Sequence, residues 1–113
     1  MAKASGDPER IALPVAGDYA RSKALVLTLV DQVGFDGLDG GSLEESWRQQ
    51  PGTPVYCTDY DTAGVRKALG GAVRERAARD RDIAWDKLAR APADLDADAV
   101  GRLIQSVCRA FHE

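Results

Sequence analysis

The feature that most constrains the fold is a strand–helix–strand pattern in the first third of the chain. Residues 11–15 form a short apolar run that predicts a buried strand, and Asp18 follows as a helix cap. Residues 19–33 carry apolar side chains at helical spacing, Gly34 stands where a helix end is expected, and residues 35–39 form a second short strand. Two strands joined by one helix predict a parallel pair with a right-handed crossover.

A parallel sheet of two strands is incomplete by itself. Such sheets contain more strands and carry helices on both faces, yet the rest of this sequence predicts mostly helices. We therefore expect an α/β fold in which one right-handed βαβ unit of a Rossmann-like sheet, within residues 1–58, precedes a helical region at residues 59–113. The predicted partner that completes the sheet is a missing N-terminal Rossmann half or another copy of the chain.

Composition argues against two classes of partner. The formal charge of −3 is mild and both signs are interspersed, which is not the basic pattern of a nucleic-acid-binding protein. The sequence contains no apolar stretch of about 18 residues, and its first residues lack the apolar core of a signal peptide. We expect a cytoplasmic protein that binds neither nucleic acid nor membranes.

The cysteines and the single histidine do not predict a metal site. Zinc requires three or four clustered Cys, His or carboxylate ligands, and the sequence contains no such cluster around Cys57, Cys108 or His112. Cys108 fits a small buried apolar side chain. Cys57 lies in a loop, where a thiol near a binding site is the alternative to a structural role.

The loop after the second predicted strand is the strongest candidate for a ligand site. Ligands of open α/β sheets bind at the carboxyl ends of the strands, and Gly41 lets the backbone approach a ligand closely. Acidic residues beside the loop disfavour a phosphate there. Further along, Trp47 and Tyr56 flank a Pro-rich turn and could form walls for a planar ring, although packing against an adjoining domain explains them equally well. The candidate pocket residues are Gly41, Ser42, Trp47 and Tyr56.

The last predicted helix has the most regular apolar stripe. Asp96 or Asp98 is expected to cap it. The stripe consists of Val100, Leu103, Ile104, Val107, Cys108 and Phe111. Packing on the chain's own helices, a homodimer contact and docking onto a missing domain all remain open for this stripe.

Several segments, in the same order, resemble the C-terminal half of NADP-dependent oxidoreductases related to the reductases of the deazaflavin coenzyme F-420. The resemblance covers nearly the whole chain. It is carried by residues 10–18, 23–24, 33–36, 39–43, 45–48, 52–56 and 82–88. The family has a Rossmann fold followed by a small helical end, and its opening strand leads into a G-x-G-x-x-G turn for the dinucleotide pyrophosphate. This chain lacks that turn.

The resemblance implies the C-terminal portion of an enzyme that passes hydride between NADPH and a deazaflavin or another planar or carbonyl acceptor. NADP would then bind only with an N-terminal half that supplies the glycine turn. Whether the chain itself is enzymatic stays open, and no catalytic residue is identified. The alternative is a non-enzymatic module, derived from a truncated reductase, that serves oligomerisation or protein interaction.

Overall fold

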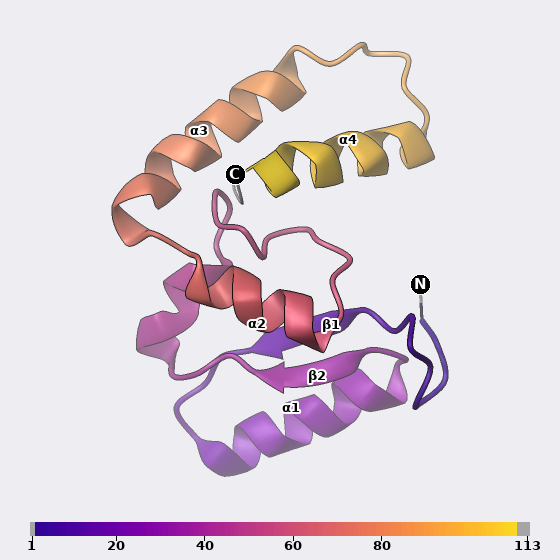
Figure 1. Cartoon of the computed structure of the whole chain (residues 1–113), viewed down its shortest axis with the longest axis vertical. Helices are drawn as coiled ribbons and strands as arrows, with labels where there is room; N and C mark the ends of the chain where they lie inside the picture. Colours follow the sequence, from indigo (N-terminus) through magenta and orange to yellow (C-terminus); the bar gives the residue numbers. More distant parts are fainter. Residues whose placement is uncertain (1, 111–113) are drawn as a thin grey trace. The chain divides into compact units, whose positions relative to one another are not determined.

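A computed structural model describes residues 2–110, except for the side chains of Cys108 and Arg109. The predictions for the Cys108 side chain, Phe111 and His112 therefore lie outside the described residues. Figure 1 shows the element order. It is β1 (Ala12–Val15), α1 (Ala20–Gln32), β2 (Asp36–Asp39), the 3-10 helix η1 (Leu43–Gln49), α2 (Thr62–Gly70), α3 (Arg74–Ala89) and α4 (Ala97–Arg109).

The predicted fold class is confirmed, because β1, α1 and β2 form a parallel βαβ unit that precedes helices. Ala12 is in register with Asp36, and Val15 with Asp39. Within residues 2–110 the sheet contains these two strands.

The ends of α1 are set by different means. The predicted cap at Asp18 is wrong, because the helix follows Tyr19 without a side-chain cap and the Asp18 carboxylate accepts the Leu43 N–H instead (3.0 Å). The predicted C-terminal glycine is confirmed. Gly34 has a φ of +105°, and its N–H donates to the Asp31 carbonyl (3.1 Å). This left-handed residue ends the helix and lets the chain enter β2.

The helix α1 covers one face of the sheet and approaches β2 closely at Gly37. A Cβ atom at Gly37 would lie 2.8 Å from Leu27 Cδ2 and 3.3 Å from the Leu27 carbonyl oxygen, so a glycine permits this close packing. The opposite face of the sheet carries Ala12 and Leu38, both buried. No residue of α1 itself is fully buried. Several apolar side chains of α1 are therefore left exposed by the described residues.

A buried arginine ties the end of α1 to both strands. Arg10 is only 3% exposed, and its guanidinium donates to the carboxylates of Asp31 (2.7 Å) and Asp36 (3.1 Å). It also donates to the Asp31 carbonyl (2.7 Å). The hydrogen bond with Asp31 raises the pKa of Arg10, so the side chain remains charged. The planar guanidinium satisfies several acceptors at once, which an ammonium group would do less well.

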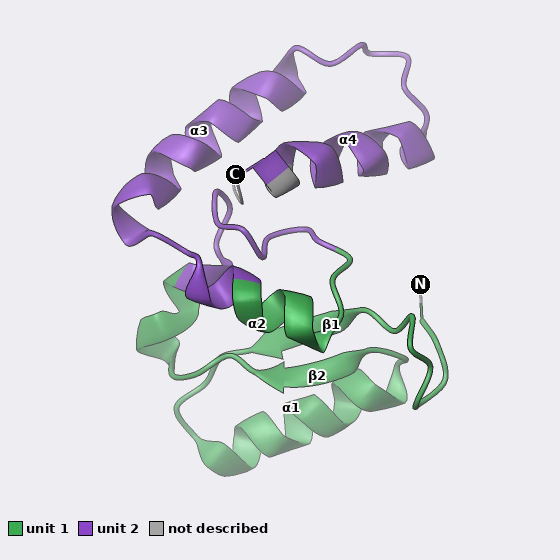
Figure 2. Cartoon of the chain, in the orientation of Figure 1, with its two compact units in different colours: residues 1–47, 59–67 green, residues 48–58, 68–113 purple. Residues whose placement is uncertain are grey.

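The chain separates into two compact units (Figure 2). Unit 1 consists of residues 1–47 and 59–67, and unit 2 of residues 48–58 and 68–113. Each unit thus includes residues from both sides of position 58.

In unit 2 the Pro-rich loop packs against α3 at Gly52. Gly52 has a φ of +90°, and a Cβ there would overlap the Ala77 carbonyl oxygen and lie 2.5 Å from the Arg81 nitrogen. The helices α3 and α4 contact each other, and Asp96 caps α4 by accepting the Ala99 N–H (2.7 Å). The prediction of a cap at Asp96 or Asp98 is therefore confirmed for Asp96.

Candidate functional site

In unit 1 the carboxyl ends of β1 and β2 bring two loops together. The Gly40 N–H donates to the Val15 carbonyl (2.8 Å), and the Gly17 N–H donates to the Gly41 carbonyl (2.9 Å). The contact of Asp18 with Leu43 joins the same two loops. This edge is where open α/β sheets bind ligands, and it includes Gly41, which the sequence predicted as a pocket residue.

Lys23 organises this edge from the first turns of α1. Its ammonium group lies 2.9 Å from Asp39 Oδ1 and 3.2 Å from the Gly41 carbonyl oxygen. The same Asp39 oxygen accepts the Gly41 N–H (2.9 Å). The hydrogen bond from Lys23, together with that from Gly41, lowers the pKa of Asp39. The loop is therefore fixed by a charged side chain from the helix and one from the strand.

A shallow pocket of about 250 Å³ lies beside this network. We call it the Lys23 pocket. Its lining consists of Asp18, Ala20, Lys23, Ala24, Leu27 and Asp39. Its one basic group is already engaged by Asp39, and Asp18 adds a second carboxylate. Glu44 and Glu45 follow in the first turn of η1. This charge does not favour a pyrophosphate in the Lys23 pocket.

Three of the four predicted pocket residues belong to unit 1. Gly41 has a φ of +95°, a conformation that favours glycine. Ser42 follows it, and its carbonyl accepts the Glu45 N–H (3.1 Å). Trp47 is half-buried in η1. Gly41 lies in the loop described above, whereas neither Ser42 nor Trp47 lines the Lys23 pocket.

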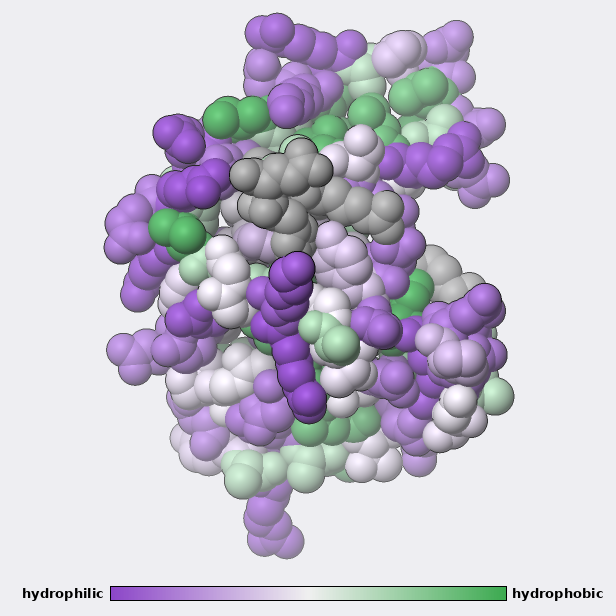
Figure 3. Space-filling model, in the orientation of Figure 1, coloured by the Kyte–Doolittle hydropathy of each residue, from purple (hydrophilic) through white to green (hydrophobic). Residues whose placement is uncertain are grey.

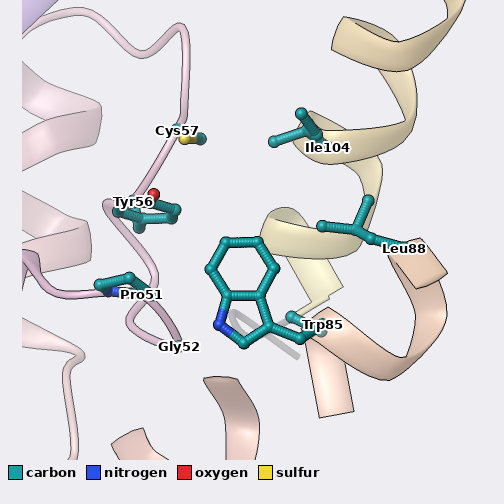
Figure 4. A pocket seen from close by; sticks show the side chains of 8 residues that line it. Pro51, Gly52, Tyr56, Cys57, Trp85, Leu88 and Ile104 are labelled. Carbon is teal, nitrogen blue, oxygen red and sulfur yellow. The ribbon is translucent and has the colours of Figure 1, made fainter. Parts of the chain in front are cut away.

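Tyr56, the fourth predicted residue, lines a different pocket that lies wholly within unit 2. Figure 4 shows the Trp85 indole projecting from α3 toward Pro51 and Tyr56 of the Pro-rich loop. The cavity has a volume of about 70 Å³. Its lining is Pro51, Gly52, Tyr56, Cys57, Ala84, Trp85, Leu88 and Ile104. The aromatic neighbour of Tyr56 in this lining is thus Trp85, which sequence reasoning did not select.

Cys57 stands at the edge of this second pocket with its thiol free. The residue is exposed and has a φ of +53°, which is uncommon for a residue other than glycine. Figure 4 shows Cys57 on the Pro-rich loop and Ile104 on α4, and both residues line the cavity. Among residues 2–110, no group of three His, Cys, Asp or Glu side chains could hold a metal ion.

Comparisons with known proteins give a limited result. No family model matches the chain, and no solved structure matches it. Protein YjhV of Escherichia coli (strain K12) is 46% identical over 64 residues, which is 57% of this chain and 47% of YjhV. The match therefore spans about half the length of this curated relative. Among the described helices, none has the length and apolar character needed to cross a membrane.

Proposed function

We propose that this chain is the C-terminal portion of an NADP-dependent oxidoreductase, similar to the reductases of coenzyme F-420. The observation that carries the proposal is the βαβ unit with its partly uncovered helix. A parallel two-stranded sheet whose helix leaves large apolar residues in solvent is expected of half a Rossmann-like sheet. The segments that resemble the reductase family include β1, the two ends of β2 and the loop that follows β2. We also propose that the protein is located in the cytoplasm.

In this proposal the chain does not hold the dinucleotide phosphates. The carboxylates around the Lys23 pocket disfavour them, so a glycine turn on another segment would bind the pyrophosphate of NADP. The missing N-terminal Rossmann half is the partner that would supply this turn. Bound NADPH would provide the hydride, and the protein would align it with a deazaflavin or another planar or carbonyl acceptor.

The predicted pocket residues have separate roles in this proposal. Ser42 would donate hydrogen bonds from its backbone and hydroxyl groups at the carboxyl edge, where Gly41 lets the ligand approach the backbone. Trp47 and Tyr56 would each supply a ring that stacks on a planar substrate. In the complete enzyme, Trp47→Ala and Tyr56→Ala should raise KM for the planar acceptor, whereas Trp47→Phe should retain most of the affinity. Each variant tests its own residue, because Trp47 belongs to unit 1 and Tyr56 to unit 2. Unchanged kinetics in either alanine variant would remove that residue from the proposal.

The first test is a fluorescence titration of NADPH into the purified chain. We expect no binding at micromolar concentrations, because the chain lacks the G-x-G-x-x-G turn that binds the dinucleotide pyrophosphate. The chain is then fused behind the glycine-turn half of a reductase from the family it resembles, and the titration is repeated. Binding by the fusion, lost when the second glycine of the turn is replaced by valine, would support the proposal. Binding by the unfused chain would contradict the assignment of the phosphate site to another segment.

A second candidate function is a non-enzymatic oligomerisation or interaction module. The exposed apolar side chains of α1 favour it, because they would be covered by any protein that packs on this helix. A folded chain that associates with itself and remains inactive after fusion to the glycine-turn half would favour this candidate over the oxidoreductase.

A further inference from the structure

The small cavity of unit 2 that is lined by Tyr56 and Trp85 has an apolar and aromatic wall. We call it the Trp85 pocket. The described residues that line it come from the Pro-rich loop, α3 and α4, and none of them carries a charge. Figure 3 shows hydrophobic residues, in green, between α3 and α4, with hydrophilic residues, in purple, on the outer sides of these helices. A ligand group that enters the pocket meets no counterion there, so the pocket selects an uncharged group.

The pocket is hollow because two of its lining residues have almost no side chain. Gly52 has no Cβ, and Ala84 contributes a single methyl group from α3, where it is buried. The rings of Tyr56 and Trp85 border the remaining space, together with two branched aliphatic side chains of α3 and α4 (Figure 4). The cavity of about 70 Å³ is therefore bounded mainly by rings and aliphatic groups.

The loop wall of the pocket is held in place by hydrogen bonds within the loop. Thr53 is only 1% exposed, and its hydroxyl donates to the Gln50 carbonyl (2.7 Å). The Tyr56 N–H donates to the Thr53 carbonyl (3.2 Å), and the Thr58 hydroxyl donates to the Val55 carbonyl (3.0 Å). Tyr56 thus lies within a run of hydrogen-bonded turns. A wall that is already ordered loses little conformational entropy when a ligand binds.

The apolar groups of the pocket remain in contact with water. Trp85 is 48% exposed although its indole lines the cavity, and Tyr56, Leu88 and Ile104 are half-buried. An apolar ligand that replaces water against these groups gains binding free energy. An aromatic ligand gains more than an aliphatic one of the same size, because aromatic rings attract each other beyond the area that they bury.

The volume of the pocket limits the ligand to one ring. An engineered apolar cavity of about 150 Å³ in another protein binds benzene. The Trp85 pocket has roughly half that volume and is not fully enclosed, since Trp85 reaches the solvent. It therefore accepts part of a single ring, and a three-ring system of the deazaflavin type does not fit inside.

We propose that the Trp85 pocket binds a small molecule through one uncharged aromatic ring, which packs against Tyr56 and Trp85. The identification of this ring with the acceptor rests on the proposed function. On that basis the acceptor is a single-ring aromatic carbonyl compound and not a deazaflavin. Binding of the ring itself requires no NADPH, so the two proposals are tested separately.

The test follows the indole N–H signals of the full chain by NMR while benzyl alcohol is added. The chain contains two tryptophans, and Trp47→Phe identifies which signal belongs to Trp85. Cyclohexylmethanol is the matched ligand, because it has a ring of the same size that is not aromatic. Tyr56→Ala removes one ring of the pocket, whereas Tyr19→Ala removes an exposed tyrosine of unit 1 and is the matched control. Circular dichroism checks that each variant is folded.

We expect a saturable shift of the Trp85 signal, with a dissociation constant of about 1–10 mM, and no shift of the Trp47 signal. Cyclohexylmethanol should bind at least about threefold more weakly, as should benzyl alcohol to Tyr56→Ala, whereas Tyr19→Ala should bind like the wild type. If Tyr56→Ala fails to fold, the pair of ligands still decides.

Equal shifts of both indole signals, or equal affinities for the two ligands, would overturn the proposal. Lumichrome, an uncharged three-ring compound, tests the size limit, and tighter binding of lumichrome than of benzyl alcohol to Trp85 would contradict it. Ring binding by the chain together with no NADPH binding by the fusion would support the Trp85 pocket and count against the oxidoreductase.

Discussion

The guanidinium of Arg10 lies 2.7 Å from the carboxylate of Asp31, a residue at the far end of the helix that follows β1. The same guanidinium also contacts Asp36 at the first position of β2. Arg10 therefore links the start of β1 to the end of α1 and to the start of β2. The Arg10 side chain is almost fully buried, whereas both carboxylates remain partly exposed. An arginine in this position acts as a clamp between the ends of three elements.

Replacing Arg10 should therefore destabilise unit 1. Arg10→Met removes every hydrogen bond to Asp31 and Asp36, and we expect a clear fall in the urea midpoint. Arg10→Lys should fall between the wild type and Arg10→Met, because an ammonium group cannot reproduce the planar contacts. Arg21→Met, at an exposed position of α1, is the matched control and should leave the midpoint nearly unchanged. Equal midpoints for Arg10→Met and Arg21→Met would show that the clamp contributes nothing.

Val65 should be among the side chains that are most costly to truncate. It is completely buried in α2, and Val65→Ala removes two methyl groups and leaves a cavity. We expect a loss of about 2 kcal/mol in the free energy of unfolding. Val100→Ala, at a position of α4 that is 39% exposed, should change it by less than about 0.5 kcal/mol. Chemical denaturation followed by circular dichroism compares the two.

Two glycines of unit 2 should respond to alanine in opposite directions. Gly52→Ala places a methyl group against the Ala77 carbonyl in a left-handed conformation, at an expected cost of about 2–4 kcal/mol. Gly70→Ala meets no atom within 4 Å at the end of α2, and it should be neutral or gain up to about 1 kcal/mol. The same denaturation assay measures both. A stable Gly52→Ala variant would contradict the close packing of the loop on α3.

Asp39 should make stability dependent on pH in the acid range. Its pKa is lowered below the ordinary value of 3.8 in the folded chain, chiefly by the hydrogen bond from Lys23. The stabilisation is therefore fully present above the unfolded-state pKa and is lost as the pH falls through the lower folded-state value. The difference between wild type and Asp39→Asn should be constant near neutral pH and shrink in strong acid. Urea midpoints measured between pH 7 and pH 3 check this, and a difference that grows on acidification would refute it.

The sequence predicted the βαβ unit because its signals are local. The apolar spacing of residues 19–33 and the glycine at position 34 specify a helix and its end without reference to distant partners. The cap assigned to Asp18 failed for the opposite reason. Its carboxylate is used by Leu43, and that contact exists only after the two loops meet at the sheet edge.

The lining around Tyr56 could not be read from the sequence for a similar reason. The sequence predicts Tyr56 as a ring-stacking residue, but the indole that lines the same pocket belongs to Trp85 in a helix much further along the chain. Their proximity depends on how the Pro-rich loop packs on α3 through Gly52. Periodicity predicts the face of a helix and not the loop that will cover it.

The proline in β1 has a consequence for how far assembly can proceed. A sheet with two open edges can add copies at both, and identical additions then continue into a fibre. Pro14 lacks an N–H, and Tyr60 already occupies the neighbouring donor of Ala12, so growth in that direction is blocked. Any strand that completes the sheet must therefore pair with β2. The completed sheet has β1 as its last strand on the other side and does not extend beyond it.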